Sequence, residues 1–429
     1  MTFTDLNLIK PILRALAEKG YDQPTSIQEQ AIPYIIQNHD ILGCAQTGTG
    51  KTAAFALPII QKLQLLKNQQ KYHSGILALI LSPTRELALQ IDDNIRWYAK
   101  HTSIRHTVIF GGVNQNRQVQ KLRGGVDILT ATPGRLLDLT EQGFIDLSNI
   151  KIFVLDEADR MLDMGFINDI QKIIRLIPKK RQSLFFSATV PDSILQLSKS
   201  ILTEPKRIDI SPENKTADTV QQYIYYTNRN SKNDLLLHIL EDDDKDQVLL
   251  FSRTKHGADR ITRKLSQHQI KAAAIHGDRS QGQRQKALKD FKSGKVRVLV
   301  ATDIASRGID IDKLKYVINY DIPLESETYV HRIGRSGRAG EEGIAISISE
   351  PEENILVREI ENLIQQRIEV VGDNPYPQTD KPMTAAERKE FNKEKARRKQ
   401  AFFANRKSMT GPAKNGRSKS RTPRRQKQK

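Results

Sequence analysis

The stretch from Ala45 to Thr52, Ala-Gln-Thr-Gly-Thr-Gly-Lys-Thr, restricts the possible folds of this chain more than any other feature. It follows a short apolar run typical of a strand, Asp40–Cys44, and precedes a run typical of a helix, Ala53–Leu57. A strand, a glycine-rich loop ending in Lys-Thr and a helix form a phosphate cradle, because backbone N–H groups and the positive end of the helix face the anion. In such a cradle Lys51 reaches the β/γ-phosphates and the Thr52 hydroxyl binds Mg²⁺.

One position departs from the strict form of this pattern. The form Gly-x-x-x-x-Gly-Lys-[Ser/Thr] begins with glycine, whereas this loop begins with Ala45. An ordinary glycine turn before a helix is therefore the alternative interpretation. On the phosphate-cradle interpretation, the other loop residues that contact the nucleotide are Gln46, Thr47, Gly48, Thr49 and Gly50.

Composition limits the class of protein. At 429 residues the chain is long enough for two or three domains, and its 38% apolar content is adequate for packed cores. The longest uninterrupted apolar run, Ile76–Leu81, is far too short to span a bilayer, and Met1–Asp5 shows no secretory pattern. The single cysteine, Cys44, excludes an internal disulfide framework and a multi-cysteine zinc site. We therefore expect a cytoplasmic protein without a membrane segment.

The net charge of +18 is concentrated near the C-terminal end. Residues 373–429 contain 18 Lys and Arg against 5 Asp and Glu, which accounts for +13 of the total. A basic tail of this kind indicates a polyanionic partner. The segment Lys407–Lys429 has too few apolar residues to fold alone, so we predict a largely disordered tail.

Short apolar runs alternate with helical ones in two successive regions. The first region has predicted strands at Asp40–Cys44, Ile76–Ser82, Thr107–Phe110, Asp127–Thr130, Ile152–Asp156 and Ser183–Ser187. The second has them at Val248–Ser252, Ala272–His276, Val296–Ala301, Tyr316–Tyr320 and Ile344–Ile348. Near-continuous apolar strands are typical of parallel sheets covered by helices on both faces. We predict an α/β fold with a first domain at 40–204 and a second at 221–372. The N-terminal region 1–39 would pack on the first domain, 205–220 would link the two, and 373–429 would be the tail.

Ligands of parallel sheets bind at the carboxyl ends of the strands. The distinctive residues of this chain follow predicted strands, at Pro83-Thr84-Arg85, Gly111-Gly112, Thr132-Pro133-Gly134-Arg135, Asp156-Glu157 and Ser187-Ala188-Thr189. Nucleotide hydrolysis needs a carboxylate that holds Mg²⁺ and a group that orients the attacking water, and Asp156 and Glu157 suit these roles. Two solvated acids at a strand end are the alternative. The four-residue word Asp-Glu-Ala-Asp at 156–159 arises by chance in only about 3 of 1,000 chains of this length.

Over residues 1–370 the chain resembles the DEAD-box ATP-dependent RNA helicases of superfamily 2. The resemblance lies in a series of ordered motifs: Phe3 with Gly20–Gln28, Ala45–Thr52, Pro83–Ala88, Gly111-Gly112, Thr132–Arg135, Asp156–Asp159, Ser187–Thr189, Leu250–Thr254, Gln281–Arg284, Ala301–Asp310 and His331–Arg338. Ala45 is the residue this family usually has, which accounts for the departure noted above. The segment Arg160–Phe166 looks most like the bacterial RhlE-type branch.

The resemblance implies two RecA-like domains that bind ATP and RNA across the cleft between them. By family position, Phe3 would stack on adenine and Gln28 would read the adenine edge with its amide, which both donates and accepts. The residues that would hold the phosphates and Mg²⁺ are Lys51, Thr52 and Asp156, with Glu157 as general base. The second domain would supply Gly308, Asp310 and two arginine fingers, Arg335 and Arg338. Surface solubility or tail-like RNA contact is the alternative role of these two arginines.

The resemblance also implies sequence-independent contacts to the RNA backbone. By family position the contact residues are Pro83, Thr84, Arg85, Gly112, Thr132, Gly134, Arg135, Arg253, Gly277 and Thr302. Ser187, Thr189 and His331 would couple the two sites, and closure of both domains on ATP and single-stranded RNA would part a short duplex. Ribosomal or RNA-degradation components are candidate partners of a monomeric protein.

Two other functions share some of these motifs. An ATP-gated RNA clamp, in which hydrolysis serves only for release, has every motif of an unwinding enzyme. A DNA-translocating helicase of the same superfamily is disfavoured by Gln28 and by the literal acidic motif.

Overall fold

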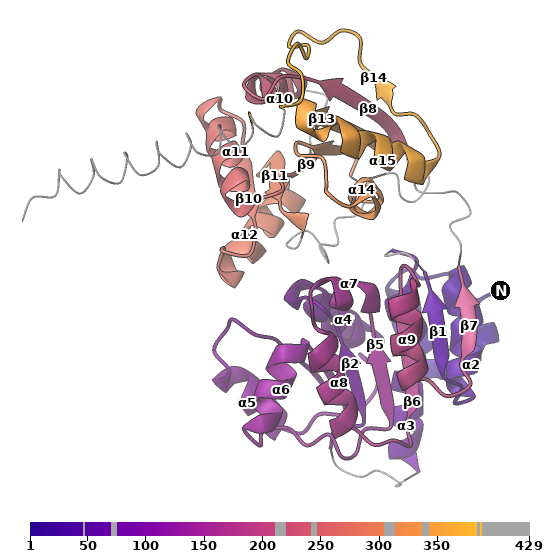
Figure 1. Ribbon diagram of the computed structural model, residues 1–429. Coiled ribbons are helices and arrows are strands. Elements are labelled where there is room, and N and C mark those ends of the chain that lie inside the picture. Colours follow the sequence, from indigo (N-terminus) through magenta and orange to yellow (C-terminus); the bar gives the residue numbers. More distant parts are fainter. Residues whose placement is uncertain are drawn as a thin grey trace, which may run out of the picture.

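The computed structural model describes residues 1–45, 48–69, 75–210, 220–241, 247–303, 314–336, 343–383 and 387. Within these residues the chain forms two lobes, each built on a seven-stranded sheet with helices on both faces (Figure 1). All strand pairs in both sheets are parallel. The predicted α/β fold of two RecA-like domains is confirmed.

The first lobe has the strand order β3-β4-β2-β5-β6-β1-β7. Its strands are β1 (Ile41–Cys44), β2 (Ala78–Leu81), β3 (His106–Ile109), β4 (Ile128–Ala131), β5 (Ile152–Leu155), β6 (Gln182–Ser187) and β7 (Lys206–Asp209). Its helices are η1 (Phe3–Leu6), α1 (Lys10–Glu18), α2 (Ser26–Ile36), α3 (Lys51–Asn68), α4 (Arg85–Tyr98), α5 (Asn116–Arg123), α6 (Pro133–Glu141), α7 (Ala158–Asp163), α8 (Ile167–Leu176) and α9 (Asp192–Ile201).

The second lobe has the strand order β10-β11-β9-β12-β13-β8-β14. Its strands are β8 (Val220–Tyr226), β9 (Val248–Phe251), β10 (Ala272–Ile275), β11 (Val298–Ala301), β12 (Tyr316–Asn319), β13 (Gly343–Ser349) and β14 (Glu369–Val370). Its helices are α10 (Lys232–Glu241), α11 (Lys255–Gln267), α12 (Gln281–Lys292), α14 (Ser326–Ile333), η2 (Pro351–Glu353) and α15 (Asn354–Ile364).

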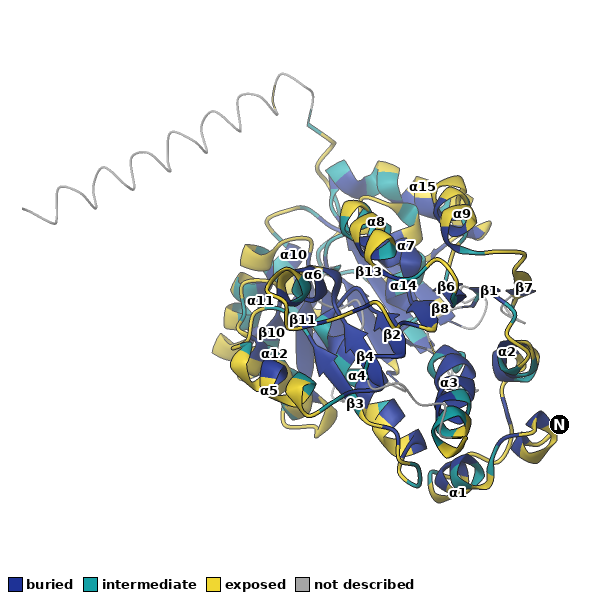
Figure 2. Cartoon of the chain, turned by 90° about the horizontal axis from the view of Figure 1, so that it is seen from below, coloured by how far each residue is buried: buried dark blue, intermediate teal, exposed yellow. Residues whose placement is uncertain are grey.

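The apolar strands divide their side chains between two cores. Successive side chains of a strand point to opposite faces, so on β2 Ile80 joins the core under α3 and α4 while Leu79 and Leu81 join the core on the other face. Figure 2 shows the strands buried and the outer surfaces of the helices exposed. This two-sided burial explains why the strands have no polar alternation in the sequence.

Three strands were absent from the sequence prediction. β7 is a polar edge strand in which only Ile208 is buried, and it lies inside the predicted linker 205–220, whose first boundary is therefore wrong. β8 mixes glutamines and tyrosines, and β14 has two exposed residues. β7 and β14 are edge strands and β8 lies next to the edge strand β14, and strands at or near an edge can keep polar residues because part of their surface faces solvent.

The predicted boundary of the tail at 373 is also wrong. Asn374 Nδ2 donates to the Tyr226 carbonyl at 2.8 Å, and the backbone N–H groups of Thr379 and Asp380 both donate to Asn228 Oδ1 at 2.9 Å. These bonds attach the segment to the end of β8. The predicted disordered segment Lys407–Lys429 lies outside the described residues.

The parallel arrangement places the ends of all strands of one sheet on one edge. β1 pairs with β6 from Ile41 opposite Leu184 to Cys44 opposite Ser187, so the loop after β1 begins beside the loop after β6. The Ala45 N–H donates to the Ser187 carbonyl at 3.0 Å across this junction. None of the described helices is long and apolar enough to cross a lipid bilayer.

We predict that a chain truncated after Gly372 melts at a lower temperature than one truncated after Met383. The shorter chain loses the hydrogen bonds to Tyr226 and Asn228, which together contribute about 1–3 kcal/mol. Thermal unfolding followed by circular dichroism measures the difference, and equal melting temperatures would contradict the attachment.

Candidate functional site

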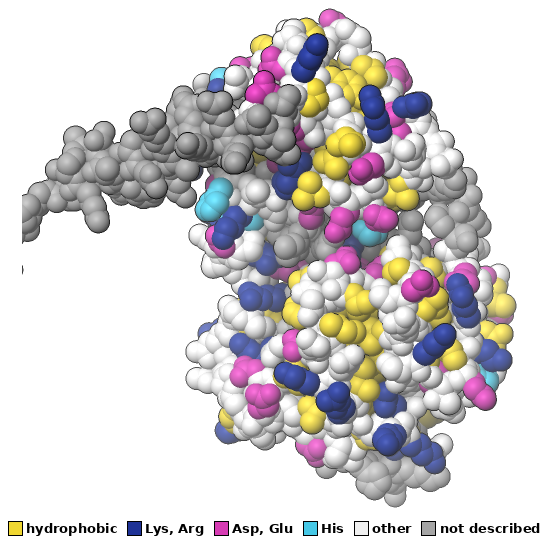
Figure 3. Space-filling view, in the orientation of Figure 1, with side chains coloured by type: hydrophobic (Ala, Val, Ile, Leu, Met, Phe, Trp, Pro, Cys, Tyr) yellow, Lys and Arg dark blue, Asp and Glu magenta, His cyan; other side chains and the backbone are white. Residues whose placement is uncertain are grey.

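A cavity of about 700 Å³ opens on the strand-end edge of the first lobe and reaches the second lobe. Charged side chains gather along the line where the two lobes meet (Figure 3). The cavity is lined by residues of the N-terminal region, the loop after β1, α4 and the end of β5. From the second lobe it is lined by Lys292 and Arg335. The N-terminal region, predicted to pack on the first domain, thus forms one wall of the cavity.

The loop after β1 has the shape of a phosphate cradle. Gly48 and Gly50 adopt positive φ angles of 89° and 94°, and Gly50 is the N-cap of α3. A Cβ atom on Gly50 would lie 2.3 Å from Gln28 Nε2, so only glycine fits there. Gln46 and Thr47 lie outside the described residues.

Gln28 braces this loop. Its Nε2 donates to the Gly50 carbonyl at 3.1 Å, and its Oε1 accepts the Thr25 backbone N–H at 3.1 Å. Gln28 lines the cavity but is only 3% exposed. The Gln28 amide has a second N–H and a second oxygen lone pair that these two bonds do not use. An adenine edge would therefore hydrogen-bond to that N–H and that lone pair.

Two opposite charges are buried in the cavity without a hydrogen-bond partner among the described residues. They are the Lys51 ammonium, on a residue 6% exposed, and Asp156 Oδ1, on a residue 4% exposed. Burial raises the pKa of Asp156 to about 7, although the Lys51 charge opposes the rise. Unpartnered buried charges are costly, so this pair indicates a place for an anion at Lys51 and a cation at Asp156.

The donor set fits Mg²⁺. The described residues contain no cluster of three or more His, Cys, Asp or Glu side chains suited to a metal. Mg²⁺ commonly takes one or two carboxylates together with phosphate oxygens and waters. Asp156 supplies a carboxylate oxygen, and Thr52 follows Lys51 in the first turn of α3.

Glu157 is held in a fixed orientation. It is the N-cap of α7 with a φ of 55°, and its Oε2 accepts the Arg160 Nη1 at 2.5 Å. Burial acts to raise the pKa of Glu157, but the Arg160 and Lys51 charges outweigh it and hold that pKa below its ordinary value. Glu157 is therefore an ionised carboxylate facing the cavity.

The loops after β5 and β6 are hydrogen-bonded to each other. Asp159 Oδ2 accepts the backbone N–H groups of Ala188 and Thr189 at 3.1 and 2.9 Å, and the Thr189 hydroxyl at 3.1 Å. Ser187 Oγ accepts the Asp159 N–H at 3.3 Å. Ser187 and Thr189, which are predicted to couple the two sites, thus both hydrogen-bond to Asp159 of the acidic motif.

The second lobe contributes Arg335 to the same cavity. Arg335 is 6% exposed and is one of the charges that lower the pKa of Glu157. It follows α14, which carries the half-buried His331. Three further residues predicted for this half of the site lie outside the described residues: Gly308, Asp310 and Arg338.

The structure does not place Phe3 in the cavity, which corrects the expectation that its ring stacks on adenine. Phe3 is 4% exposed and packs in the core of the first lobe. The aromatic rings that line the cavity are Tyr21, Trp97 and Tyr98, and Tyr21 is 36% exposed. The sequence signal for Tyr21 is its position directly after Gly20, within the stretch that contains Gln28.

A second group of predicted residues lies on the same edge of the first lobe, away from the cavity. Thr84 caps α4, and Thr132 is the N-cap of α6, so both helix N-termini lie at this edge. The rest of the group follows β2, β3 and β4: Pro83, Arg85, Gly112, Gly134 and Arg135. A Cβ on Gly112 would lie 2.3 Å from the Arg85 guanidinium, so glycine lets that side chain pass.

Positive charge accumulates on this edge. Burial lowers the pKa of Arg85, and so do the Arg284 and Arg135 charges, while the Glu86 charge opposes them. Arg135 Nη1 and Arg284 Nε are buried without hydrogen-bond partners among the described residues. Such a cluster favours phosphate groups.

The second lobe presents its strand ends to this cluster. Arg253 follows β9, Gly277 follows β10 and Thr302 follows β11. Glu86 of α4 accepts Gln281 Nε2 at 3.0 Å and pairs with Arg284 Nη2 at 3.1 Å, which joins the two lobes.

The sequence did not predict the bridge from Glu86 to Gln281 and Arg284 or the Glu157–Arg160 pair. The bridging residues lie in motifs already recognised, Pro83–Ala88 and Gln281–Arg284. Contact between residues 195 positions apart has no signal in one sequence.

Comparison with known proteins agrees with this arrangement. A family model described as DEAD/DEAH box helicase matches residues 25–197, and one described as helicase conserved C-terminal domain matches residues 231–340. The ATP-dependent RNA helicase CshA of Limosilactobacillus reuteri is 41% identical over 368 residues, covering 86% of this chain and 73% of the relative. RhpA of Helicobacter pylori, named a DEAD-box ATP-dependent RNA helicase, is 41% identical over 369 residues, covering 86% of this chain and 74% of the relative.

A solved structure shares the whole two-lobe fold. S. cerevisiae Dbp5 bound to RNA and ADP BeF3 has a TM-score of 0.75 and 31% sequence identity, and the match covers 86% of this chain and 95% of that chain. The two family models and the relatives named above together cover most of the chain. The chain belongs to the DEAD-box family of ATP-dependent RNA helicases.

Proposed function

We propose that ATP binds in the cavity between the lobes and that RNA crosses the strand-end edge beside it. The observation that carries this proposal is the pair of unpartnered buried charges, Lys51 and Asp156, in a cavity that Arg335 of the other lobe also lines. An anion with an attached cation satisfies both charges, and a magnesium–nucleoside triphosphate is such a ligand.

The phosphates are held by the loop after β1. Lys51 contacts the β/γ-phosphates, and the backbone N–H groups from Ala45 to Thr52 surround them, with Gln46, Thr47, Gly48, Thr49 and Gly50 between. Thr52 and Asp156 would hold Mg²⁺ in this cavity, where Asp156 Oδ1 has no hydrogen-bond partner among the described residues. When bound there, Mg²⁺ would supply positive charge beside the phosphate oxygens.

The remaining steps of hydrolysis use residues of both lobes. Glu157, ionised and oriented by Arg160, accepts the proton of the attacking water. Arg335 stabilises charge on the transferred phosphoryl group, with Arg338, Gly308 and Asp310 completing the half-site of the second lobe. Since Arg335 belongs to the other lobe, hydrolysis depends on how closely the lobes approach each other.

The adenine ring occupies the wall formed by the N-terminal region. Tyr21, partly exposed in the cavity, stacks on the base, and Gln28 contacts its edge. Because Gln28 also holds Gly50, base recognition is connected to the shape of the phosphate loop.

RNA binds along the strand ends through its backbone. The cluster of Arg85, Arg135 and Arg284 supports this placement. The contact residues are Pro83, Thr84, Arg85, Gly112, Thr132, Gly134 and Arg135 in the first lobe, and Arg253, Gly277 and Thr302 in the second. Ser187, Thr189 and His331 connect the two sites.

Four finer assignments are also proposals. The segment Arg160–Phe166 supports an RhlE-type chain, while the relatives compared above bear the names CshA and RhpA. Its RNA substrates support a cytoplasmic location. We further propose a monomer that works with ribosomal or RNA-degradation components.

We expect Lys51→Ala to abolish ATP turnover, because the triphosphate loses its buried cation. Glu157→Gln should bind ATP and RNA but hydrolyse ATP at least about 10²-fold more slowly. Phosphate release with saturating RNA measures both effects, and the exposed Lys172→Ala on α8 is the matched control. Normal turnover in Lys51→Ala would refute the site.

We expect Arg335→Ala to lower kcat by about 10³-fold while the affinity for ATP changes little. Single-turnover hydrolysis and binding of a fluorescent ATP analogue separate the two quantities. The exposed Arg358→Ala in the same lobe controls for loss of a positive charge. A loss of ATP affinity with kcat unchanged would instead assign Arg335 to ground-state binding.

We expect Phe3→Ala and Tyr21→Ala to have opposite consequences. Phe3→Ala should lower the free energy of unfolding by about 3 kcal/mol, because it leaves a cavity in the core. Tyr21→Ala should weaken ATP binding about tenfold with little change in stability, because it removes base stacking. Denaturant unfolding and nucleotide titration of both variants test this. The reverse pattern would restore the adenine contact to Phe3.

A further inference from the structure

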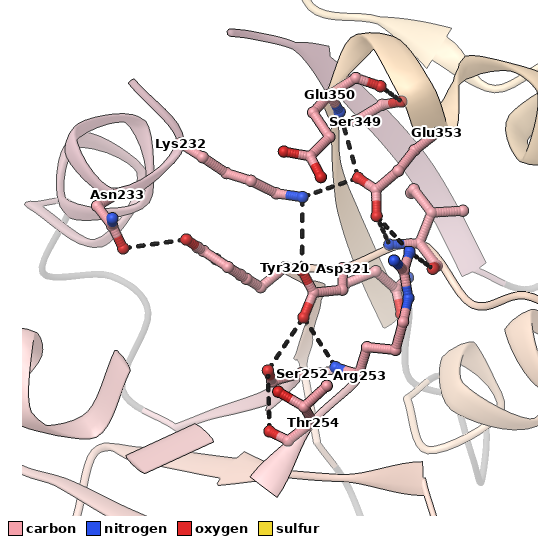
Figure 4. A network of polar contacts seen from close by, with 12 residues as sticks. Lys232, Asn233, Ser252, Arg253, Thr254, Tyr320, Asp321, Ser349, Glu350 and Glu353 are labelled. Carbon is pink, nitrogen blue, oxygen red and sulfur yellow. Dashed lines mark hydrogen bonds and ion pairs between the residues drawn. The ribbon is translucent and has the colours of Figure 1, made fainter. Parts of the chain in front are cut away.

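A buried carboxylate in the second lobe, Glu353 at the end of η2, lies outside every motif discussed above. Glu353 is 2% exposed. Figure 4 shows its carboxylate within a polar network that includes Lys232, Arg253 and Asp321. It accepts four hydrogen bonds, from Lys232 Nζ at 2.8 Å, Arg253 Nη2 at 2.5 Å, Ile322 N at 3.2 Å and Glu350 N at 3.2 Å.

The four donors come from four separate segments. Lys232 begins α10, Arg253 follows β9, Ile322 lies between β12 and α14, and Glu350 precedes η2. A buried carboxylate whose hydrogen-bonding capacity is filled in this way fixes the relative positions of its donors.

One part of the Arg253 guanidinium is hydrogen-bonded within the protein, and the other part is not. Its Nη2 donates to Glu353 and, at 2.7 Å, to the Ile322 carbonyl, and its backbone N–H donates to Asp321 Oδ2 at 2.8 Å. Its Nε and Nη1 have no hydrogen-bond partner among the described residues, and the side chain is 34% exposed. The guanidinium is therefore fixed in orientation while it still presents N–H groups to the strand-end edge.

The same network continues to α14. Asp321 also accepts the Ser252 hydroxyl at 3.0 Å, and its backbone carbonyl accepts Arg332 Nη1 at 2.6 Å. Arg332 in turn pairs with both carboxylate oxygens of Asp303, the residue after Thr302. The network thus runs from Arg253, proposed to contact RNA, to Asp303, the residue after the other proposed contact Thr302.

We propose that Glu353 is a positioning residue for RNA binding, which holds the guanidinium of Arg253 in the orientation that receives a backbone phosphate. This inference rests on the proposed RNA contact of Arg253. Glu353 acts through Arg253, and it lies too deep in the lobe to touch RNA itself. The competing explanation is that Glu353 only neutralises the buried Lys232 charge and has no part in RNA binding.

A double substitution separates the two explanations. Glu353→Gln alone leaves the Lys232 ammonium buried without the negative charge of Glu353. This single variant should therefore melt at a lower temperature. Lys232→Met/Glu353→Gln removes both buried charges and keeps similar volumes, which should restore much of the lost stability. Neither substitution alters Arg253.

For the double variant we expect the RNA concentration for half-maximal ATPase activity to rise about tenfold. We expect kcat at saturating RNA and the affinity for an ATP analogue in the absence of RNA to stay close to those of the unmodified chain. Glu352→Gln, which removes a neighbouring charge with no hydrogen-bond partner among the described residues, should leave all three quantities unchanged. Half-maximal activation of the double variant at the original RNA concentration would overturn the proposal.

Arg253→Gln distinguishes failure of this inference from failure of the proposed RNA contact. If Arg253→Gln weakens RNA binding and the double variant does not, Glu353 has no positioning role. If Arg253→Gln leaves RNA binding unchanged, the RNA contact of Arg253 is wrong and the inference is wrong with it.

Adding Arg253→Gln to the double variant should cause no further loss of RNA affinity, because the effects of residues that act through one group are not additive. Additive losses would show that Glu353 does not act through Arg253 and would overturn the proposal.

Discussion

The structure depends on one constraint, that all strand pairs in each sheet are parallel. Parallel strands end on one edge, so loops far apart in the sequence converge there. The two lobes contact each other through these edges, as the bridge from Glu86 to Gln281 and Arg284 shows. One edge therefore provides both the cavity proposed for the nucleotide and the surface proposed for RNA. Any change in the approach of the lobes acts on both.

Buried charges divide into two classes that have different uses. Glu353 and Lys232 are paired and hydrogen-bonded within the second lobe, so their cost of burial is offset inside the protein. The Lys51 ammonium and Asp156 Oδ1 have no hydrogen-bond partner within the described residues, and we propose that a bound ligand offsets much of the cost of burying them. This difference separates the paired residues Glu353 and Lys232 from the proposed ligand-binding residues Lys51 and Asp156, although all four are buried.

Sequence patterns predicted the central strands because these are buried on both faces and hence continuously apolar. They failed at β7, β8 and β14 because strands at or near a sheet edge keep polar residues. The family resemblance also predicted that Phe3 contacts the nucleotide. A match to a family motif identifies a position, but it does not show what the side chain at that position contacts in this chain. In the folded chain Phe3 packs in the core, and Tyr21 lines the cavity.

The sequence by itself determined the fold class, the phosphate loop from Ala45 to Thr52 and the acidic pair Asp156-Glu157, because their chemistry lies within a few consecutive residues. The tertiary structure alone decided that Arg335 lines the same cavity as Lys51, that Glu86 joins the lobes and that Glu353 holds Arg253. These contacts join residues from about 100 to nearly 300 positions apart. Their existence depends on how two separately folded sheets pack, which no local pattern encodes.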